Sequence, residues 1–265
     1  MALECVPLSG SLGAEVRGVD VTELSDSRFA ELHAAFLEHH VLVFRDQKLT
    51  PGQQVDFAER WGPLLIHPIF PHLDGYPPII HIQNRGKKRT LTEVWHSDVT
   101  FDAKPPLGSM LYALEVPSAG GDTLFANQHK VFARFSPGLQ KMLEGLRAIH
   151  SGKLLGAIAG EGEQWQQQGQ SHPVVRTHPE TGRKALYVNR GFTVAFEDMT
   201  PAESAPLLRY LLQQATAPDV TCRHAWRRGD LVFWDNRSVM HYAIHDHDDA
   251  TRVLHRITVE GDTPC

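Results

Sequence analysis

Residues 230–236 read DLVFWDN, an apolar and aromatic run bounded by Asp and Asn, and this composition predicts a buried β-strand. The four residues that follow, RSVM (237–240), predict a short turn. His241 comes directly after that turn. We therefore expect its imidazole at a place where a strand ends and side chains can face a cavity.

The rest of the chain extends this β-rich pattern. Seven further segments are β-branched or aromatic and are bounded by Gly, Pro, Asn or Asp: VLVFR (41–45), PIIHIQ (78–83), GSMLYALEV (108–116), HPVVRTH (172–178), KALYVN (184–189), TCRHAW (221–226) and RVLHRITVE (252–260). These segments do not alternate regularly with helical segments, which argues against a parallel βαβ sheet. The pattern predicts a mainly β protein, a sandwich or jelly roll with a few peripheral helices.

The helices have clear start signals. A helix predicted over residues 25–40 carries its apolar side chains on one face. TPGQ (50–53) combines an N-cap, a proline at the first helical position and a capping-box glutamine, and it predicts a helix that runs to about Trp61. Ser-Pro at 136–137 and TPAE at 200–203 repeat the same start signal.

The composition is that of an ordinary soluble globular protein. The chain has 265 residues, of which 42% are apolar and 22% charged, and this is enough for a single domain, 1–265. The formal net charge of −5 gives no reason to expect a nucleic-acid partner. A signal-peptide pattern and a long apolar run are both absent from the sequence, and the three cysteines are scattered. We therefore expect a cytoplasmic protein with free thiols and no membrane contact.

Histidine is over-represented, with 16 residues in the chain, and histidine is the commonest metal ligand. WHSD (95–98) places His96 and Asp98 two positions apart. In a strand these side chains would share one face, with Cα atoms roughly 7 Å apart, and could converge on one ion. His241 is the best-placed third ligand, and it would complete the two-His, one-carboxylate set of non-haem Fe(II) oxygenases.

Two alternatives stay open at this point. A zinc hydrolase can use the same three ligands, so the ligand set alone does not identify the metal. The dense acidic cluster HDHDD (245–249) also resembles a metal site, but its composition is typical of a turn, and we interpret it as a solvated loop. We assign the remaining histidines to loops, strand packing and the surface.

Two arginines near the C-terminus indicate anion binding. In the predicted strand 252–260, Arg252 and Arg256 share a face, with Cα atoms about 13 Å apart, while Val253, His255 and Ile257 lie on the other face. An unpaired buried charge is very costly, and this strand offers no acidic partner for either arginine. Two anionic small molecules, each bound by one guanidinium, would satisfy both. Such a pair favours an enzyme with an anionic co-substrate and an anionic substrate over a zinc hydrolase.

One stretch differs from the rest of the chain. GKLLGAIAGEGEQWQQQGQS (152–171) is rich in Gly and Gln and has weak periodicity. Long segments of this kind are often functional. We predict either a flexible lid or an ordinary surface loop around 152–171.

Taken together, these motifs resemble the Fe(II)/2-oxoglutarate-dependent dioxygenases of the taurine dioxygenase (TauD/TfdA-like) family. The resemblance extends over nearly the whole chain and rests on the following segments: RGVDV (17–21), LVFRDQ (42–47), IHPIFPHLDG (66–75), WHSDVTF (95–101), GGDTLFAN (120–127), HPVVRTHP (172–179), NRGFT (189–193), WDNRSVMHYA (234–243) and TRVLHRITVEGD (251–262). It implies a double-stranded β-helix, the cupin-like jelly roll, with Fe(II) at one end.

The resemblance also implies roles for individual residues. The iron ligands would be His96, Asp98 and His241. Thr123 and Arg252 would hold the distal carboxylate of 2-oxoglutarate. The substrate-binding residues would be His67, Phe70, Thr92, Phe101, Phe192 and Arg256, with Arg256 and His67 on the anionic group and the aromatic side chains as pocket walls.

The chain departs from the taurine enzymes at three positions. Phe70 stands where those enzymes have Tyr, Thr92 stands where they have Asn, and Gly156 falls where they place a pocket Phe. Two polar contacts and one wall are therefore changed. A site built to hydrogen-bond a group discriminates strongly against ligands that lack it, so the substrate need not be taurine.

The implied reaction couples oxidative decarboxylation of 2-oxoglutarate by O2, to succinate and CO2, with hydroxylation of a small anionic organic substrate. Taurine or another alkyl sulfonate is expected first, and collapse of the product would release sulfite and an aldehyde. A sulfate ester or an aryloxy carboxylate would fit the same chemistry. A zinc hydrolase and a non-catalytic anion sensor are the rivals from other classes. Edge strands and apolar helix faces leave room for a homo-oligomer, a dimer or tetramer.

Overall fold

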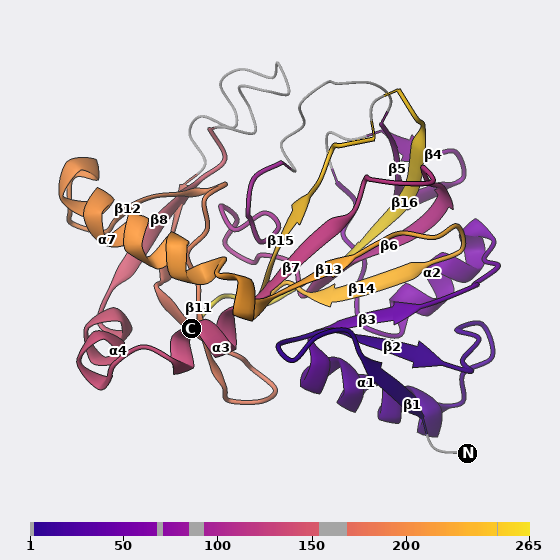
Figure 1. Ribbon diagram of the computed structural model, residues 1–265, viewed down its shortest axis with the longest axis horizontal. Coiled ribbons are helices and arrows are strands. Elements are labelled where there is room, and N and C mark those ends of the chain that lie inside the picture. The colour runs from indigo at the N-terminus through magenta and orange to yellow at the C-terminus, as the bar shows by residue number, and fades with distance from the viewer. Residues whose placement is uncertain (1–2, 68–70, 85–92, 154–168, 248) are drawn as a thin grey trace.

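Two facing β-sheets form the centre of the protein in the computed structural model, which describes residues 3–67, 71–84, 93–153, 169–247 and 249–265 (Figure 1). The larger sheet has eight strands in the order β1 (Glu4–Pro7), β2 (Ala14–Arg17), β3 (Val41–Phe44), β14 (Leu231–Asp235), β6 (Gly108–Glu115), β16 (Arg252–Val259), β5 (Tyr76–Asn84) and β4 (His72–Leu73). The smaller sheet has the order β13 (Thr221–His224), β7 (Thr123–Asn127) and β15 (Val239–Ala243). All neighbours pair antiparallel except β2 and β3. The prediction of a mainly β jelly roll is confirmed.

The packing of strand β14 explains the apolar run LVFW within DLVFWDN. Val232 and Trp234 point towards the smaller sheet and pack with Phe125 of β7. Leu231 and Phe233 alternate with them and point to the opposite face. Because both faces of the strand are covered, the four positions from Leu231 to Trp234 are all apolar and show no polar alternation.

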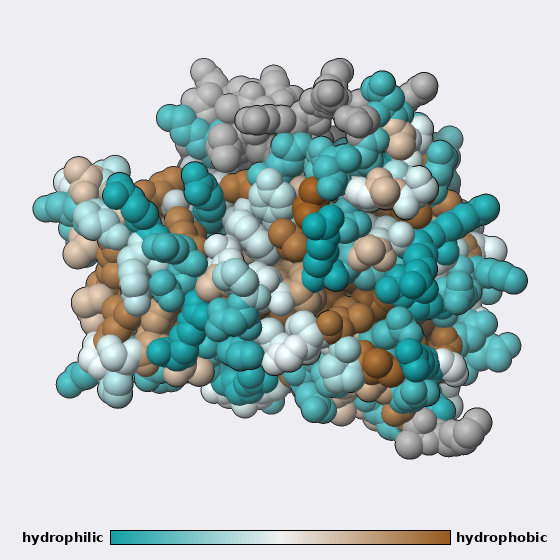
Figure 2. All heavy atoms as spheres, in the orientation of Figure 1, coloured by the Kyte–Doolittle hydropathy of each residue, from teal (hydrophilic) through white to brown (hydrophobic). Residues whose placement is uncertain are grey.

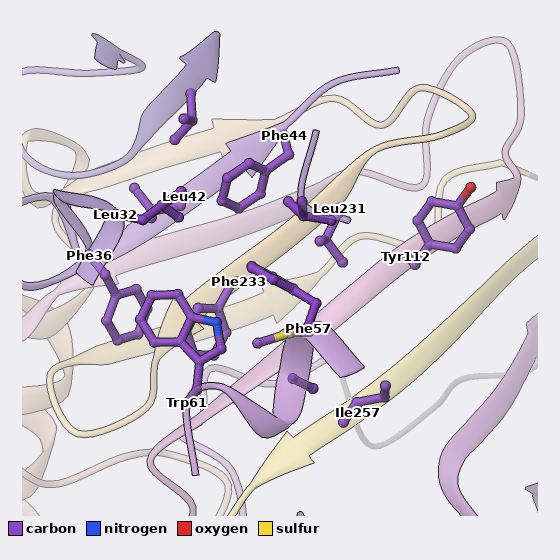
Figure 3. Close-up of a cluster of buried hydrophobic side chains, with 14 of the residues drawn as sticks. Leu32, Phe36, Leu42, Phe44, Phe57, Trp61, Tyr112, Leu231, Phe233 and Ile257 are labelled. Carbon is purple, nitrogen blue, oxygen red and sulfur yellow. The ribbon is translucent and has the colours of Figure 1, made fainter. Parts of the chain in front are cut away.

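The outer face of the larger sheet is covered by the helices α1 (Asp26–His39) and α2 (Pro51–Glu59). Figure 3 shows the aromatic part of this layer, in which Phe36 and Trp61 lie against Phe233. The Phe36 and Phe233 rings stack at 4.2 Å, and the Trp61 ring lies 4.6 Å from that of Phe233. Aromatic pairs of this kind contribute about 1 kcal/mol beyond the area they bury.

The predicted helix starts are confirmed, three of them by capping hydrogen bonds, while Ser136 precedes α4 (Pro137–Glu144) without a side-chain capping bond. The Ser25 hydroxyl accepts from the Arg28 amide at the start of α1. Capping boxes form at Thr50 for α2 and at Thr200 for α7 (Pro201–Ala215). Helix α2 ends at Glu59, slightly before the predicted Trp61, and α7 continues through Pro206.

A third layer packs beside the smaller sheet and lies on the left of Figure 1. Its members are α3 (Gln128–Ala133), α4 (Pro137–Glu144), α7, β8 (Arg147–Ser151), β9 (Gly169–Pro173), β10 (Val175–Thr177), β11 (Lys184–Leu186), β12 (Thr193–Phe196) and the short η1 (Pro218–Val220). The segment 172–178, predicted as one strand, is two: β9 pairs with β8 and β10 with β11, and Val174 between them is buried. Several other strands, such as β7 and β15, were not predicted because they are short and partly polar.

On the face shown in Figure 2, hydrophilic and apolar side chains are interspersed. Among the described residues, no helix has the length and apolar character needed to cross a membrane. The expectation of a lid at 152–171 falls mostly on residues 154–168, which lie outside the described residues.

Many histidines are buried, and those in β8, β9, β13 and β16 fit the assignment of part of the surplus to strand packing. The buried histidines include His40, His129, His150, His172, His178, His224, His247 and His255. Burial lowers the pKa of His40 to about 3, of His150 to about 3 and of His129 to about 4. These groups are therefore neutral in the folded protein at pH 7.

Acid should destabilise the protein through these groups. Between pH 6.5 and about 3, a histidine in the unfolded chain binds a proton, whereas folded His40 and His150 do not. Their contribution to the free energy of unfolding is therefore fully present above pH 6.5 and is lost as the pH falls through this window. Each such group contributes up to about 1.4 kcal/mol per pH unit. Denaturant titrations at several pH values measure the free energy of unfolding. This free energy should fall less steeply with decreasing pH in His150→Gln than in wild type. The exposed-site control His72→Gln should keep the wild-type dependence, and equal slopes for wild type and His150→Gln would contradict the prediction.

Candidate metal centre and co-substrate site

His96 and His241 are held opposite each other by the backbone. The His96 amide donates to the His241 carbonyl at 3.1 Å, and the His241 amide donates to the His96 carbonyl at 2.8 Å. His96 thus extends the smaller sheet by one position beside β15, and directly opposed residues of antiparallel strands project to the same face. The two ring centroids are 4.2 Å apart. His241 is the central residue of β15, so its expected place at the end of a strand was wrong.

Asp98 reaches the same point from a turn, not from a strand. The Asp98 amide donates to Asn236 Oδ1 at 2.6 Å, and Asn236 Nδ2 donates back to the Asp98 carbonyl at 3.0 Å. Val99, the next residue, has φ 50°, an uncommon left-handed conformation for a β-branched side chain. The prediction that His96 and Asp98 share the face of a regular strand was therefore wrong, although the two side chains do converge.

The three side chains present their donor atoms to one point. Asp98 Oδ1 lies 3.7 Å from His96 Nε2 and 3.6 Å from His241 Nε2, and all three ligand atoms lie within 4.8 Å of one another. His96 Nδ1 lies 2.7 Å from the Val94 carbonyl, which can only accept, so Nδ1 carries the proton and Nε2 offers its lone pair. Donors that each sit about 2.1 Å from one ion would have this spacing.

The protonation states also suit a metal. Burial lowers the pKa of His96 and of His241, so both imidazoles are neutral at pH 7. Burial alone would raise the pKa of Asp98, but Arg256 and the two imidazoles hold it below its usual range. Neutral imidazoles and an ionised carboxylate are the ligating forms, so the residues fit a divalent ion.

Arg256 lies beside the three ligands. Its Nη2 is 2.8 Å from Asp98 Oδ2 and donates to Ser109 Oγ at 3.1 Å, while its Nε donates to Thr258 Oγ1 at 3.3 Å. Arg256 has no acidic partner in its own strand, as expected, but Asp98 approaches it from another part of the chain. The inward face predicted for this strand is confirmed.

Arg252 is buried and has a different environment. Its Nε has no hydrogen-bond partner within the described part of the chain, and its guanidinium lies 5.4 Å from the Trp226 ring centroid. Burial lowers the pKa of Arg252 to about 10, against the opposing effect of Asp122, so the group is still a cation at pH 7. A Cβ added at Gly121 would approach Arg252 Cδ to 3.2 Å, so the absence of a side chain there makes room for the arginine.

Trp226 connects Arg252 to Thr123. The Trp226 indole donates to Thr123 Oγ1 at 3.0 Å, on the same ring that lies next to the guanidinium. In the ladder between β7 and β15, His241 opposes Phe125 and Ala243 opposes Thr123, so Thr123 shares the face of His241 roughly 7 Å away. The structure therefore brings together the proposed co-substrate pair and the metal ligands, and Trp226 was missed because its neighbours are distant in sequence.

The residues expected to line a substrate pocket are described in part. Burial, with a contribution from Arg256, lowers the pKa of His67 to about 4, so His67 is neutral at pH 7. The Phe101 and Phe192 rings lie 5.1 Å apart, and the Phe192 ring lies 6.1 Å from that of His96. Phe70, Thr92 and Gly156 lie outside the described residues.

The loop that carries HDHDD is solvated at Asp246 and Asp249, as expected, but its two histidines are largely covered. The His245 side chain is 8% exposed and its Nδ1 lies 2.9 Å from Glu93 Oε1. His247 is buried beside Gly121, and Asp246 accepts from the Gly121 amide at 2.8 Å. Within the described part of the chain, only His96, Asp98 and His241 form a set that could hold a metal ion. That this loop contributes no ligand stays a prediction, and the burial of its two histidines was not expected.

A two-His, one-carboxylate set inside a jelly roll, beside a buried cationic arginine, defines the class of non-haem metal-dependent oxygenases. The sequence pattern of the taurine catabolism dioxygenase TauD, TfdA family matches residues 4–258, and the chain belongs to this family. An alkylsulfatase of Acinetobacter baylyi is 37% identical over 98% of this chain and 86% of its own length. An alpha-ketoglutarate-dependent sulfate ester dioxygenase of Pseudomonas putida is 31% identical over 100% of this chain and 91% of its own. The crystal structure of a taurine dioxygenase from Burkholderia xenovorans superimposes with a TM-score of 0.89 at 36% identity, covering 100% of this chain and 91% of that one.

Proposed function

We propose that this 2-oxoglutarate-dependent dioxygenase uses Fe(II) and O2 to hydroxylate a small organic sulfonate next to its sulfur, and that the product collapses to sulfite and an aldehyde. The observation that carries this proposal is the convergence of His96, Asp98 and His241 beside two arginines on one strand face. One arginine, Arg252, is buried without an acidic partner among the described residues. A zinc hydrolase has no use for such a second anion site.

Each group has a separate task in this proposal. His96, Asp98 and His241 would hold the iron, which when bound supplies the activation of O2 and the oxidation of the substrate. Arg252 and Thr123 would bind the distal carboxylate of 2-oxoglutarate, with Trp226 keeping both in place. A buried guanidinium can both bind and orient this carboxylate, because two parallel hydrogen bonds fix its direction and the low dielectric of the site strengthens them.

The substrate would be held on the other side of the metal ligands. Arg256 Nε and Nη2 donate to groups within the protein, whereas Nη1 has no hydrogen bond to any described residue and can donate to an anionic oxygen of the substrate. His67 would act as a neutral hydrogen-bond donor, since its pKa is lowered to about 4. The aromatic pair Phe101 and Phe192 would exclude water from the carbon that is oxidised.

A second candidate substrate class is the sulfate esters. Relatives that cover nearly the whole chain are named as an alkylsulfatase and as a sulfate ester dioxygenase. A sulfate ester offers Arg256 the same three anionic oxygens, and hydroxylation of its carbon would release sulfate in place of sulfite. Aryloxy carboxylates are a third outcome of the same assay.

The direct test is succinate formation from 2-oxoglutarate under air, with Fe(II) and a panel of alkyl sulfonates, alkyl sulfates and phenoxyacetates. We expect stoichiometric succinate and sulfite with at least one sulfonate. Sulfate release with esters alone would move the proposal to the second class. Hydrolysis that continues without O2 and 2-oxoglutarate would overturn it in favour of a zinc hydrolase.

Replacement of Arg252 tests the co-substrate site. Arg252→Met keeps most of the buried stem but removes the cation, and truncation of one partner of a buried charge pair costs about 2–5 kcal/mol. We therefore expect 2-oxoglutarate affinity to fall by about 30-fold or more, measured anaerobically by calorimetry. Mn(II) affinity should stay close to wild type, because the ion pairs around Asp98 within the described chain involve His96, His241 and Arg256 and not Arg252. Wild-type 2-oxoglutarate binding in the variant would contradict this assignment.

A further inference from the structure

The two carboxylate oxygens of Asp98 have different neighbours. Oδ1 faces the Nε2 atoms of His96 and His241 at 3.7 and 3.6 Å. Oδ2 accepts from Ser109 Oγ at 2.8 Å and lies 2.8 Å from Arg256 Nη2. One oxygen is therefore directed to the candidate metal position, and the other is bound within the protein.

The direction of the Ser109 hydrogen bond follows from its partners. A hydroxyl has one proton to donate and two lone pairs that accept. Ser109 Oγ accepts from Arg256 Nη2 at 3.1 Å, and a guanidinium has donors only. The Ser109 proton is consequently given to Asp98 Oδ2, which carries a full negative charge and makes the bond a charge-assisted one.

Ser109 is placed rigidly for this contact. It is fully buried in β6, which lies between β14 and β16 in the larger sheet, and it pairs with Trp234 on one side and Thr258 on the other. Its hydroxyl cannot leave for solvent. Asp98, by contrast, comes from a turn, so the direction of its carboxylate has to be fixed by its partners.

We propose that Ser109 is a positioning residue that restricts Asp98 to ligation through Oδ1 and ties Arg256 to the same carboxylate. The proposal rests on the metal site described under the proposed function. With Oδ2 bound to Ser109 and Arg256, Asp98 occupies one coordination position where a freely rotating carboxylate can occupy two. The three protein ligands would take three of six coordination positions, 2-oxoglutarate two and O2 one. The position that Oδ2 does not occupy is therefore needed.

Direct metal binding to the purified full-length protein tests this role. The titrant is Mn(II), which is stable in air. It is added to metal-free wild type, Ser109→Ala and Ser109→Cys, and free Mn(II) is measured by electron paramagnetic resonance. Loss of an outer-shell partner typically weakens metal binding 10–100-fold, so we expect a loss of about this size in both variants. The cysteine variant roughly preserves the side-chain volume but offers only a weak donor, which separates the hydrogen bond from packing.

Thr258→Val is the matched control. It removes the neighbouring hydroxyl, which accepts from Arg256 Nε at 3.3 Å and lies 3.4 Å from Ser109 Oγ. Because the substitution leaves the shorter bond from Ser109 to Asp98 in place, Mn(II) affinity should stay at the wild-type value. Wild-type Mn(II) affinity in either Ser109 variant overturns the proposal. This holds even if the melting temperature falls, because a serine with a purely structural role would affect stability and leave metal affinity unchanged. Absence of Mn(II) binding in wild type would overturn the metal site itself, and with it this inference.

Discussion

Asp98→Ala should abolish metal binding and, with it, succinate formation. The substitution removes the sole anionic member of the three-ligand set found among the described residues. It also leaves Arg256, whose Nη2 lies 2.8 Å from Asp98 Oδ2, as an uncompensated positive charge beside the position of the metal. Since loss of an outer-shell partner alone typically costs 10–100-fold, loss of this ligand should weaken Mn(II) binding by more than about 100-fold.

The measurement for Asp98→Ala is Mn(II) titration together with succinate production under air. Asp102→Ala is a suitable control, because Asp102 follows in the same segment and is exposed, and its hydrogen bond to His172 uses the backbone carbonyl. The control should bind Mn(II) and turn over like wild type. Circular dichroism checks that both variants are folded, and turnover that survives in folded Asp98→Ala would refute the metal assignment.

Asp235→Ala should produce the largest loss of stability. The Asp235 carboxylate is fully buried and accepts from Arg237 Nε at 2.8 Å, Arg237 Nη2 at 2.9 Å, the Arg237 amide at 3.0 Å and His178 Nε2 at 2.9 Å. Arg237 and His178 hold the pKa of Asp235 below its usual range, against the opposing effect of burial. Removal leaves Arg237, 3% exposed, with Glu180 as its remaining acidic partner, and broken buried pairs of this kind cost about 3–5 kcal/mol.

For a chain of this size, that loss corresponds to a fall in melting temperature of about 10 °C. Asp219→Ala provides the matched control, since Asp219 pairs with Arg134 on the surface with its side chain 70% exposed, and such pairs contribute at most about 1 kcal/mol. The effect should reach the metal site, because Asn236 in the same turn holds the backbone of Asp98. Equal melting temperatures for the two variants would contradict the role assigned to Asp235.

The sequence predicts the strands well where both faces are buried. In β14 the apolar run is sufficient, because each of its positions packs against either helices or the facing sheet, and in β16 the apolar residues Leu254, Ile257 and Val259 do the same between polar ones. Short strands such as β7 and β15 carry polar residues that serve the site, so their composition does not distinguish them from loops. Local patterns cannot detect a strand that exists because its hydrogen-bonding partner arrives from elsewhere in the chain.

The candidate site follows the same rule. His96, Asp98 and His241 could be chosen from spacing and residue type, and the shared face of Arg252 and Arg256 from strand periodicity. The ion pair between Arg256 and Asp98 could not be foreseen, nor could the contact of Trp226 with Thr123 and Arg252. These contacts join residues far apart in sequence, and only the packing of one sheet on the other brings them together.

By itself, DLVFWDN indicated a buried strand, because its four consecutive apolar residues are β-branched, aromatic or aliphatic and are bounded by Asp and Asn. The residue types at His96, Asp98 and His241 likewise indicated a two-His, one-carboxylate metal site, although they did not identify the metal. Tertiary structure decided where the imidazoles meet, since His241 lies within a strand and His96 pairs with it through two backbone hydrogen bonds. It also decided that Asp98 points at them, because its turn is clamped by Asn236 and its second oxygen by Ser109, and none of these contacts is local in the chain.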